Sequence, residues 1–303
     1  MPAALLAFIA IFTIGALLRS VILTKAHAEK LASFVFSISL PATILVSLDR
    51  LSFSVTAWKL PLAAWLVTVP LVLCALQFAR WLKLARPTQG GFVLAAGCIN
   101  SVYFAYPVTL ATFGEEGLAQ AVLFDLGQTT LTLTVLYGVA LWHGTRAGSP
   151  GQAITRFLSS PPLWALCAIL TLKLFHLHLP SWLREGLLPL HFTTTPLASL
   201  VLGLSISFAA LRRTAKLAVF GVAVRMGGGL LFGCAAVWLL DLTGLERAIV
   251  LLVAAMPSAV TAVIFATEAC LDEDLVASVV ALSICLGMAL LPWLPRVTPL
   301  LMG

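Results

Sequence analysis

The sequence predicts an all-α polytopic membrane protein with ten transmembrane helices, and its composition and its pattern of apolar runs lead to this fold class. Hydrophobic residues make up 61% of the 303 residues, charged residues only 10%, and the mean hydropathy is +1.06. A soluble domain carries about 25% charged residues, so the chain falls in the membrane class. A transmembrane helix needs about 20 apolar residues, and the chain has room for about ten with short loops.

The predicted helices follow one another through short polar connections. The stretch 177–190 contains prolines, His178 and Arg184, so we expect a loop with a short interfacial helix there. The seventh apolar run begins among threonines before Pro196, and a threonine can cap the start of a helix. No basic region precedes the first run, so we expect it to be retained rather than cleaved. The ten runs cover residues 3–18, 31–48, 57–78, 90–113, 117–142, 157–175, 190–210, 214–240, 245–269 and 271–294.

The distribution of lysine and arginine predicts the orientation of the chain. With the N-terminus outside, the cytoplasmic loops hold most of these residues, as the positive-inside rule requires. Ten crossings then place the C-terminus outside as well. The acidic inner loop from Glu268 to Asp274 carries little weight, because acidic residues contribute little to orientation. We expect a multi-pass protein of the cell inner membrane with both termini periplasmic. The inner charges are Arg19, Lys25, Lys30, Arg80, Lys83, Arg86, Arg146, Arg156, Arg212, Arg213 and Lys216.

Several function classes lack support in the sequence. The net charge of +6 is explained by the excess of lysine and arginine in the cytoplasmic loops. The sequence has no basic run with interleaved aromatic residues, so nothing indicates nucleic-acid binding. The 6 cysteines are scattered through apolar runs and predict neither disulfides nor a zinc site. We expect His176, His178 and His191 to be ordinary interfacial histidines rather than metal ligands. No metalloprotease, P-loop or dinucleotide motif appears, so we expect no enzyme, metal or cofactor.

The most informative feature is a pair of proline-containing segments inside apolar runs, Asn100–Pro107 and Ala255–Thr261. A proline inside a helix removes one backbone hydrogen bond and clashes with the preceding turn. Irregular backbone at membrane depth is tolerated only where protein buries it or where it lines a cavity. Interrupted apolar segments at corresponding places in two halves indicate the binding site of a secondary transporter.

Other matches between the halves support an internal repeat. At an offset of 155 residues, Leu40-Pro41-Ala42 aligns with Thr195-Pro196-Leu197, and Ala111-Thr112 aligns with Ala266-Thr267. Five helices per half is an odd number, so the second copy would be inverted in the membrane. We therefore predict a first five-helix repeat over 1–150 and a second, inverted one over 151–303.

The interrupted segments predict the chemistry of the site. Each helix that begins after a break points the positive end of its dipole toward the break, which favours an anion. The freed carbonyl groups of the preceding helices could hold a cation. The alternative is a pair of kinked helices that pack without any ligand. The predicted substrate-binding residues are Asn100, Ser101, Tyr106, Pro107, Pro257, Ser258 and Thr261.

Two charges lie inside predicted helices, and such charges indicate functional sites. Asp125 shares a helical face with Gln128 and Thr129, and burial would let its carboxyl group take up and release a proton. Arg225 could bind a substrate carboxylate, or it could form a fixed ion pair with Asp125. The glycines at 227–229 beside it let another helix approach closely. The predicted coupling residues are Asp125, Gln128 and Arg225.

Two stretches resemble a known family. Asn100 to Pro107, with Phe113 to Ala119 and Leu123-Phe124-Asp125, is similar to the fourth and fifth helices of the auxin efflux carrier family. Ala255 to Val260, with Leu271-Asp272 and Ala277-Ser278, is similar to its ninth and tenth helices. The family belongs to the bile/arsenite/riboflavin transporter-like superfamily, and the chain looks like a bacterial member. Thr261 stands where an asparagine is common in the family.

The resemblance implies ten helices in two inverted five-helix repeats, with broken helices 4 and 9 that cross. It also implies a scaffold of helices 1, 2, 6 and 7, a transport domain of helices 3–5 and 8–10, and a homodimer. We therefore predict a secondary transporter that moves a small organic anion, a dicarboxylate or an auxin-like acid, by an elevator-type mechanism coupled to H+ or Na+. The alternatives are a sodium-coupled symporter of the bile-acid carrier type and, from a different class, an intramembrane sensor or enzyme.

Overall fold

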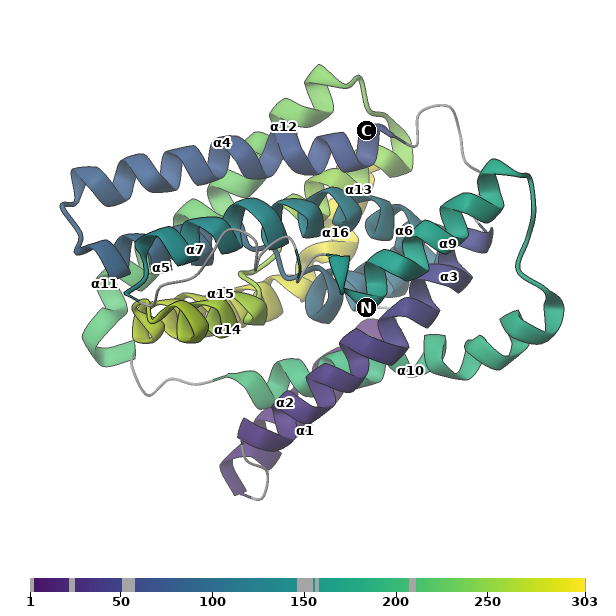
Figure 1. The fold of residues 1–303 in the computed structure, drawn as a ribbon, viewed down its shortest axis with the longest axis horizontal. Coiled ribbons are helices and arrows are strands. Elements are labelled where there is room, and N and C mark those ends of the chain that lie inside the picture. The colour runs from purple at the N-terminus through teal and green to yellow at the C-terminus, as the bar shows by residue number, and fades with distance from the viewer. Residues whose placement is uncertain are drawn as a thin grey trace. The chain divides into compact units, whose positions relative to one another are not determined.

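The computed structural model describes residues 3–21, 25–50, 58–145, 155, 158–206 and 211–302. Through these residues the chain is a succession of helices, as Figure 1 shows. The strand-like feature among them is an isolated antiparallel bridge between Ile99 and Ser258. The predicted all-α class is confirmed. Arg146 and Arg156, which entered the orientation argument, lie outside the described residues.

Six helical stretches of the described chain are long and apolar enough to cross a membrane. They support a multi-pass membrane protein, while the ten-helix inverted repeat stays a prediction. The six stretches are His27–Asp49, Lys59–Trp81, Ser101–His143, Ser181–Ser205, Leu211–Leu239 and Glu273–Met302, and shorter apolar helices cover Ala3–Arg19, Pro161–Leu174 and Val260–Ala269.

The chain forms two compact units, each built from segments that are distant in sequence. Unit 1 comprises Met1–Val55, Val102–Val122 and Phe157–Ser205, and unit 2 comprises Thr56–Ser101, Leu123–Arg156 and Ile206–Gly303. The chain passes from unit 2 to unit 1 in the π-helical turn η2 (Ser101–Ala105) and returns to unit 2 within the helix α6 (Tyr106–Leu131). Within α6, Gly114 has a positive φ of 67°, a conformation that favours glycine, and the helix is kinked there.

Unit 1 is held together by close helix contacts along α10. A Cβ atom on Gly203 would overlap the main chain of Phe12, and one on Gly15 would overlap the carbonyl oxygen of Leu200. Small residues at such positions let two membrane helices approach closely. In addition to the first part of α6, unit 1 contains the helices α1 (Ala3–Val21), α2 (Lys25–Phe34), η1 (Val35–Ser39), α3 (Leu40–Arg50), α9 (Pro161–Leu174) and α10 (Ser181–Ser205).

The structure differs from the predicted loop with a short interfacial helix over 177–190, because from Ser181 onward one continuous helix, α10, runs to Ser205. Leucine, arginine and glutamate residues fill its first turns, and these are strong helix formers. They outweigh Pro189, which removes only one backbone hydrogen bond. As a result, the polar residues around position 191 lie within a helix rather than at its start.

Unit 2 surrounds two short central helices, α5 and α13. Every residue of α5 from Gly90 to Gly97 is buried, and so is every residue of α13 from Ala248 to Ala254. α4 lies beside both α5 and α12 (Figure 1). The helices of unit 2, with the second part of α6, are α4 (Lys59–Trp81), α5 (Arg86–Gly97), η3 (Thr132–Leu136), α7 (Tyr137–His143), α11 (Leu211–Val222), η4 (Ala223–Gly228), α12 (Gly229–Leu239), α13 (Gly244–Ala254), α14 (Val260–Ala269), α15 (Glu273–Leu290), η5 (Leu291–Trp293) and α16 (Leu294–Met302).

Both proline-containing segments interrupt the helical path, although not at the same point relative to the proline. α5 ends at Gly97 and the chain is helical again from Ser101, so Pro107 follows the break and lies in the first turn of α6. α13 ends at Ala254 and α14 starts at Val260, so Pro257 lies inside its break. A proline fits the first turn of a helix because the missing N–H would have no partner there. We call residues 98–100 and 255–259 the paired breaks.

Candidate functional site

The paired breaks meet each other inside unit 2 as two short antiparallel segments. The backbone N–H of Asn100 donates to the carbonyl oxygen of Pro257 at 3.0 Å, and the N–H of Ala259 donates to that of Cys98 at 3.0 Å. These two bonds flank the bridge between Ile99 and Ser258. Each break therefore supplies hydrogen-bond partners for the other, which a membrane interior requires of irregular backbone.

Two side chains bind the carbonyl groups that the ends of α5 and α13 leave without a helical partner. Gln128 donates from Nε2 to the carbonyl oxygen of Gly97 at 3.0 Å. Arg225 donates from Nη1 to the carbonyl oxygen of Ala96 at 2.9 Å and from Nη2 to that of Ala254 at 2.5 Å. One guanidinium group thus joins the C-terminal turns of both interrupted helices.

Gln128 is held in place by α4. The hydroxyl group of Thr68 donates to Oε1 of Gln128 at 2.5 Å, and Trp65 donates from Nε1 to the carbonyl oxygen of Gly127 at 3.1 Å. A Cβ atom on Gly127 would overlap the main chain of Pro61, so glycine is needed for this close approach. The amide of Gln128 is therefore oriented, with its oxygen toward Thr68 and its nitrogen toward Gly97.

Arg225 is fully buried, with 0% of its surface exposed, and it lies in the π-helical turn η4. Single π turns in α-helices are frequent at functional sites. The hydrogen bonds that Arg225 donates in the described chain go to main-chain carbonyl oxygens, not to a carboxylate. These carbonyl partners take the place of the fixed ion pair with Asp125 that the sequence left open, while binding of a substrate carboxylate by Arg225 stays a prediction.

The paired breaks also leave buried polar atoms without a partner among the described residues. They are the hydroxyl oxygens of Ser101 and Ser258, Oδ1 of Asn100 and Nε of Arg225. Buried polar atoms are nearly always hydrogen-bonded, so unsatisfied ones need an explanation such as a ligand or a water molecule. Four such atoms lie in this region of unit 2, which makes it the candidate functional site.

The start of α14 adds backbone donors to this region. Its N-cap residue is Ala259, which makes no side-chain cap. The backbone N–H of Ser258 donates to the hydroxyl oxygen of Ser283 at 3.0 Å, and Nδ2 of Asn100 donates to the carbonyl oxygen of Ser258 at 3.3 Å. The first N–H groups of an α-helix have no intrahelical partner and favour an anion. Thr261, in the first turn of α14, is half-buried.

The remaining predicted residues are divided between the units. Asp125 is buried in α6, 8% exposed, three positions before Gln128 in unit 2. Tyr106 and Pro107 are buried at the start of α6 and belong to unit 1, where Thr109 donates to the carbonyl oxygen of Tyr106 at 3.1 Å. The structure thus groups Asn100, Ser101, Gln128, Arg225, Pro257 and Ser258 around the paired breaks.

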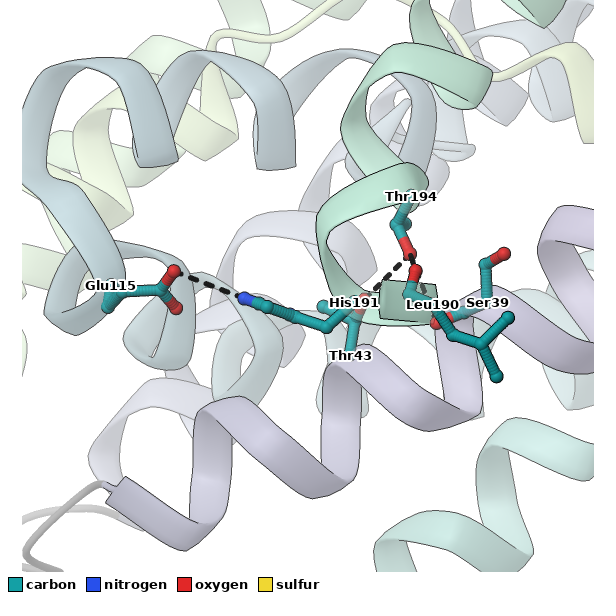
Figure 2. A network of polar contacts seen from close by, with 6 residues as sticks. All are labelled: Ser39, Thr43, Glu115, Leu190, His191 and Thr194. Carbon is teal, nitrogen blue, oxygen red and sulfur yellow. Dashed lines mark hydrogen bonds and ion pairs between the residues drawn. The ribbon is translucent and has the colours of Figure 1, made fainter. Parts of the chain in front are cut away.

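Unit 1 contains a second polar cluster that the sequence did not predict (Figure 2). Nε2 of His191, on α10, lies 3.1 Å from Oε1 of Glu115, on α6. His191 is only 3% exposed, because the continuous α10 places it inside a helix that packs against its neighbours. The expectation that it is an ordinary interfacial histidine stays a prediction. The hydroxyl group of Thr43 donates to that of Thr194 at 2.8 Å, and Thr194 contacts the carbonyl oxygens of Ser39 and Leu190.

Comparison with known proteins agrees with this architecture. A family model described as a membrane transport protein matches residues 1–294. The chain belongs to this family. It is the auxin efflux carrier family, so the resemblance seen in the sequence is confirmed. Membrane transporters of this kind are not enzymes, as the sequence predicted.

Two archaeal relatives cover most of the chain. An uncharacterized transporter of Methanothermobacter thermautotrophicus is 31% identical over 274 residues, which is 89% of each protein. An uncharacterized transporter of Methanocaldococcus jannaschii is 31% identical over 268 residues, 85% of each protein. Membrane transport is therefore the level of function that the chain shares with its relatives.

The carbonyl contacts of the paired breaks predict the effect of removing Gln128. We expect Gln128→Leu to lower the melting temperature of the purified protein, because the carbonyl oxygen of Gly97 loses its donor. A buried group left unsatisfied costs about 1–3 kcal/mol. Gln120→Leu is the matched control, since Gln120 is also buried in α6 and its Oε1 has no partner among the described residues. Equal melting temperatures for the two variants would contradict the assignment.

Proposed function

We propose that this chain is a secondary transporter that moves a small organic anion, such as a dicarboxylate or an auxin-like acid, across the cell inner membrane. The observation that carries the proposal is the set of buried, unpartnered polar atoms at the paired breaks, beside the uncapped start of α14. Irregular backbone at membrane depth is typical of substrate sites in secondary transporters. The membrane transport family supplies the general class of function.

The polarity of the free groups favours an anion. The hydroxyl groups of Ser101 and Ser258 and the Nε–H of Arg225 are donors, whereas Oδ1 of Asn100 is an acceptor. The N-terminus of α14 adds backbone N–H groups and about half a positive charge. Each hydroxyl group can also accept, but the region holds several donors that an anion can use, and a carboxylate supplies acceptors only.

Several features support the proposed inverted repeat with halves 1–150 and 151–303. α5 has 12 residues and α13 has 11, and each leads into one of the paired breaks. The hydroxyl group of Thr194 contacts the carbonyl oxygen of Ser39, and these residues are 155 positions apart, the offset found in the sequence. Ser101–His143 covers 43 residues, about twice the length of one crossing, and is kinked at Gly114. These features favour ten crossings, with broken helices 4 and 9 that cross.

The division into units supports an elevator-type mechanism. Unit 1 contains residues 1–55 and 157–205, which hold the predicted scaffold helices 1, 2, 6 and 7. Unit 2 contains most of the predicted transport helices 3–5 and 8–10, together with the paired breaks. Residues 102–122 group with unit 1, although the sequence assigns them to the transport domain. We propose that unit 2 carries the anion and unit 1 is the scaffold through which the protein forms a homodimer.

The proposed substrate site predicts a loss of affinity when its hydroxyl groups are removed. We expect Ser258→Ala to raise the KM for anion uptake into proteoliposomes about tenfold, because a hydrogen bond to a charged group is worth about 1.5–3 kcal/mol. Ser199→Ala is the control, since Ser199 is equally buried but bonds within its own helix to Thr195. If neither variant changes the KM for uptake, the paired breaks do not bind the transported anion.

For coupling, we propose that Asp125 carries the proton. We expect Asp125→Asn to abolish uptake driven by a pH gradient while anion binding, measured as a rise in melting temperature, is retained. Asparagine keeps the size and hydrogen-bonding capacity of aspartate but cannot cycle a proton. The measurement is uptake with and without a pH gradient, with stability checked by gel filtration. An active variant with unchanged pH dependence would exclude Asp125 as the proton carrier.

The proposed topology predicts labelling from opposite sides. We expect a cysteine at Glu116 to react with an impermeant thiol reagent from the periplasmic side, and one at Lys83 from the cytoplasmic side only. Both residues are exposed and flank the predicted fourth helix. Glu116 is preferable to Glu115, whose carboxylate contacts His191. The assay uses a background with the 6 native cysteines replaced, and labelling of both positions from one side would contradict the ten-helix topology.

A further inference from the structure

We propose that Arg225 is a built-in cation of the paired breaks, which takes the place of a bound Na+ and lets the site accept an anion without one. The inference deepens the proposed function and rests on it as far as transport is concerned. It starts from the two hydrogen bonds of the guanidinium group, which go to the ends of two different interrupted helices. The sequence had suggested that freed carbonyl groups at this place could hold a coupling cation.

The charge of Arg225 balances the charges of the two helix C-termini at the paired breaks. The C-terminus of a helix carries about half a negative charge, and α5 and α13 both end at the paired breaks. Together the two ends amount to about one negative charge in a buried region. Arg225 contributes one positive charge, contacts both ends and is fully buried. The pair of helix ends therefore needs no further cation.

The carbonyl oxygens at the two helix ends already accept hydrogen bonds from donors of the protein. On the first segment, Ala96 is bound by Arg225 and Gly97 by Gln128, while the carbonyl oxygens of Cys98 and Ile99 accept backbone N–H groups. On the second segment, the carbonyl oxygens of four residues accept hydrogen bonds. Those of Val253, Ala254, Pro257 and Ser258 accept, in this order, from the N–H of Met256, the guanidinium group of Arg225, the N–H of Asn100 and the side-chain amide of Asn100. A second cation at these oxygens would also be repelled by the guanidinium group beside it.

The neighbouring glycines are placed to admit Arg225. A Cβ atom on Gly229 would overlap both the carbonyl oxygen of Ala254 and Nη2 of Arg225. One on Gly228 would overlap the side chain of Leu71, whereas Gly227 faces open space. The glycine at 229 thus leaves room for the guanidinium group between α12 and the end of α13. Gly227 serves as the matched control, because an alanine there meets nothing.

The Nε–H group of Arg225 is available to a substrate. With Nη1 and Nη2 bound to carbonyl groups, Nε is buried and has no partner among the described residues. A cation held by protein oxygens whose Nε–H has no partner among the described residues can bind an oxygen of an anion directly. A Na+ ion at the same place would instead bind reversibly and couple anion binding to the sodium gradient.

The first experiment measures thermal unfolding of the purified protein in detergent with different cations. We expect the wild-type melting temperature to be the same in sodium chloride and choline chloride at equal ionic strength. We expect Arg225→Ala to melt several degrees lower, and millimolar guanidinium chloride to raise its melting temperature relative to choline chloride. Guanidinium binds the carbonyl groups that the missing side chain leaves. Gly227→Ala should melt like the wild type and gain nothing from guanidinium.

The outcomes are decisive in either direction. A wild-type melting temperature that rises with Na+ over choline would overturn the proposal, and this arm requires no variant to fold. An Arg225→Ala variant as stable as the wild type, or one that guanidinium does not stabilise, would overturn it too. If Arg225→Ala yields no folded protein, Arg225→Lys replaces it, because lysine keeps the positive charge. We expect Arg225→Lys to fold and to have the same melting temperature in sodium chloride and in choline chloride.

Uptake separates this inference from the proposed function. Melting needs no transported substrate, so it tests Arg225 whether or not an anion is moved. We expect anion uptake into proteoliposomes to be equal in sodium and choline buffers. Uptake that requires Na+ would overturn the role of Arg225 and leave anion transport intact. Na+-indifferent melting with guanidinium rescue, but without uptake of any organic anion, would instead contradict the proposed function alone.

Discussion

A break in a buried helix exposes backbone carbonyl and N–H groups that lipid cannot satisfy, and unit 2 is organised around this constraint. α5 and α13 both stop inside the protein, and each leaves its last carbonyl groups without helical partners. The solution is internal, because one break pairs with the other and Gln128 and Arg225 bind the helix ends. Thr68, Trp65 and the close approach at Gly127 in turn hold α6 and its Gln128 in place.

The same constraint leaves an asymmetry that gives the site its chemistry. The carbonyl groups of Cys98, Ile99, Pro257 and Ser258 accept hydrogen bonds from the protein. The hydroxyl groups of Ser101 and Ser258 have no partner among the described residues, and the start of α14 has no side-chain cap. Available N–H and O–H donors at a buried site give an anion hydrogen bonds. The proposed preference for an anion would then follow from how the breaks are closed, before any residue specific for one substrate is considered.

The sequence indicates which single residues are unusual for an apolar helix, but it does not indicate which groups these residues contact. Pro257 and Arg225, which are conspicuous in apolar runs, lie at the paired breaks, whereas Pro107 follows its break in the first turn of α6. The partner of Arg225 could not be predicted, because carbonyl oxygens belong to every residue and only packing selects Ala96 and Ala254. The roles of Thr68 and Ser283 were missed for a similar reason. An isolated hydroxyl group in an apolar helix usually bonds within its own turn, and only the fold places it beside another segment.

The polar cluster of unit 1 (Figure 2) shows how the same kind of contact recurs away from the paired breaks. Thr194 joins α10 to the carbonyl oxygen of Ser39, in the turn that precedes Pro41, and these residues are 155 positions apart. Asn100 joins the paired breaks to Ser258 over a nearly equal separation of 158 positions. A two-fold axis that relates two halves of a chain brings corresponding segments into contact with each other. Two such contacts, in different units and at nearly one offset, support the proposed inverted repeat.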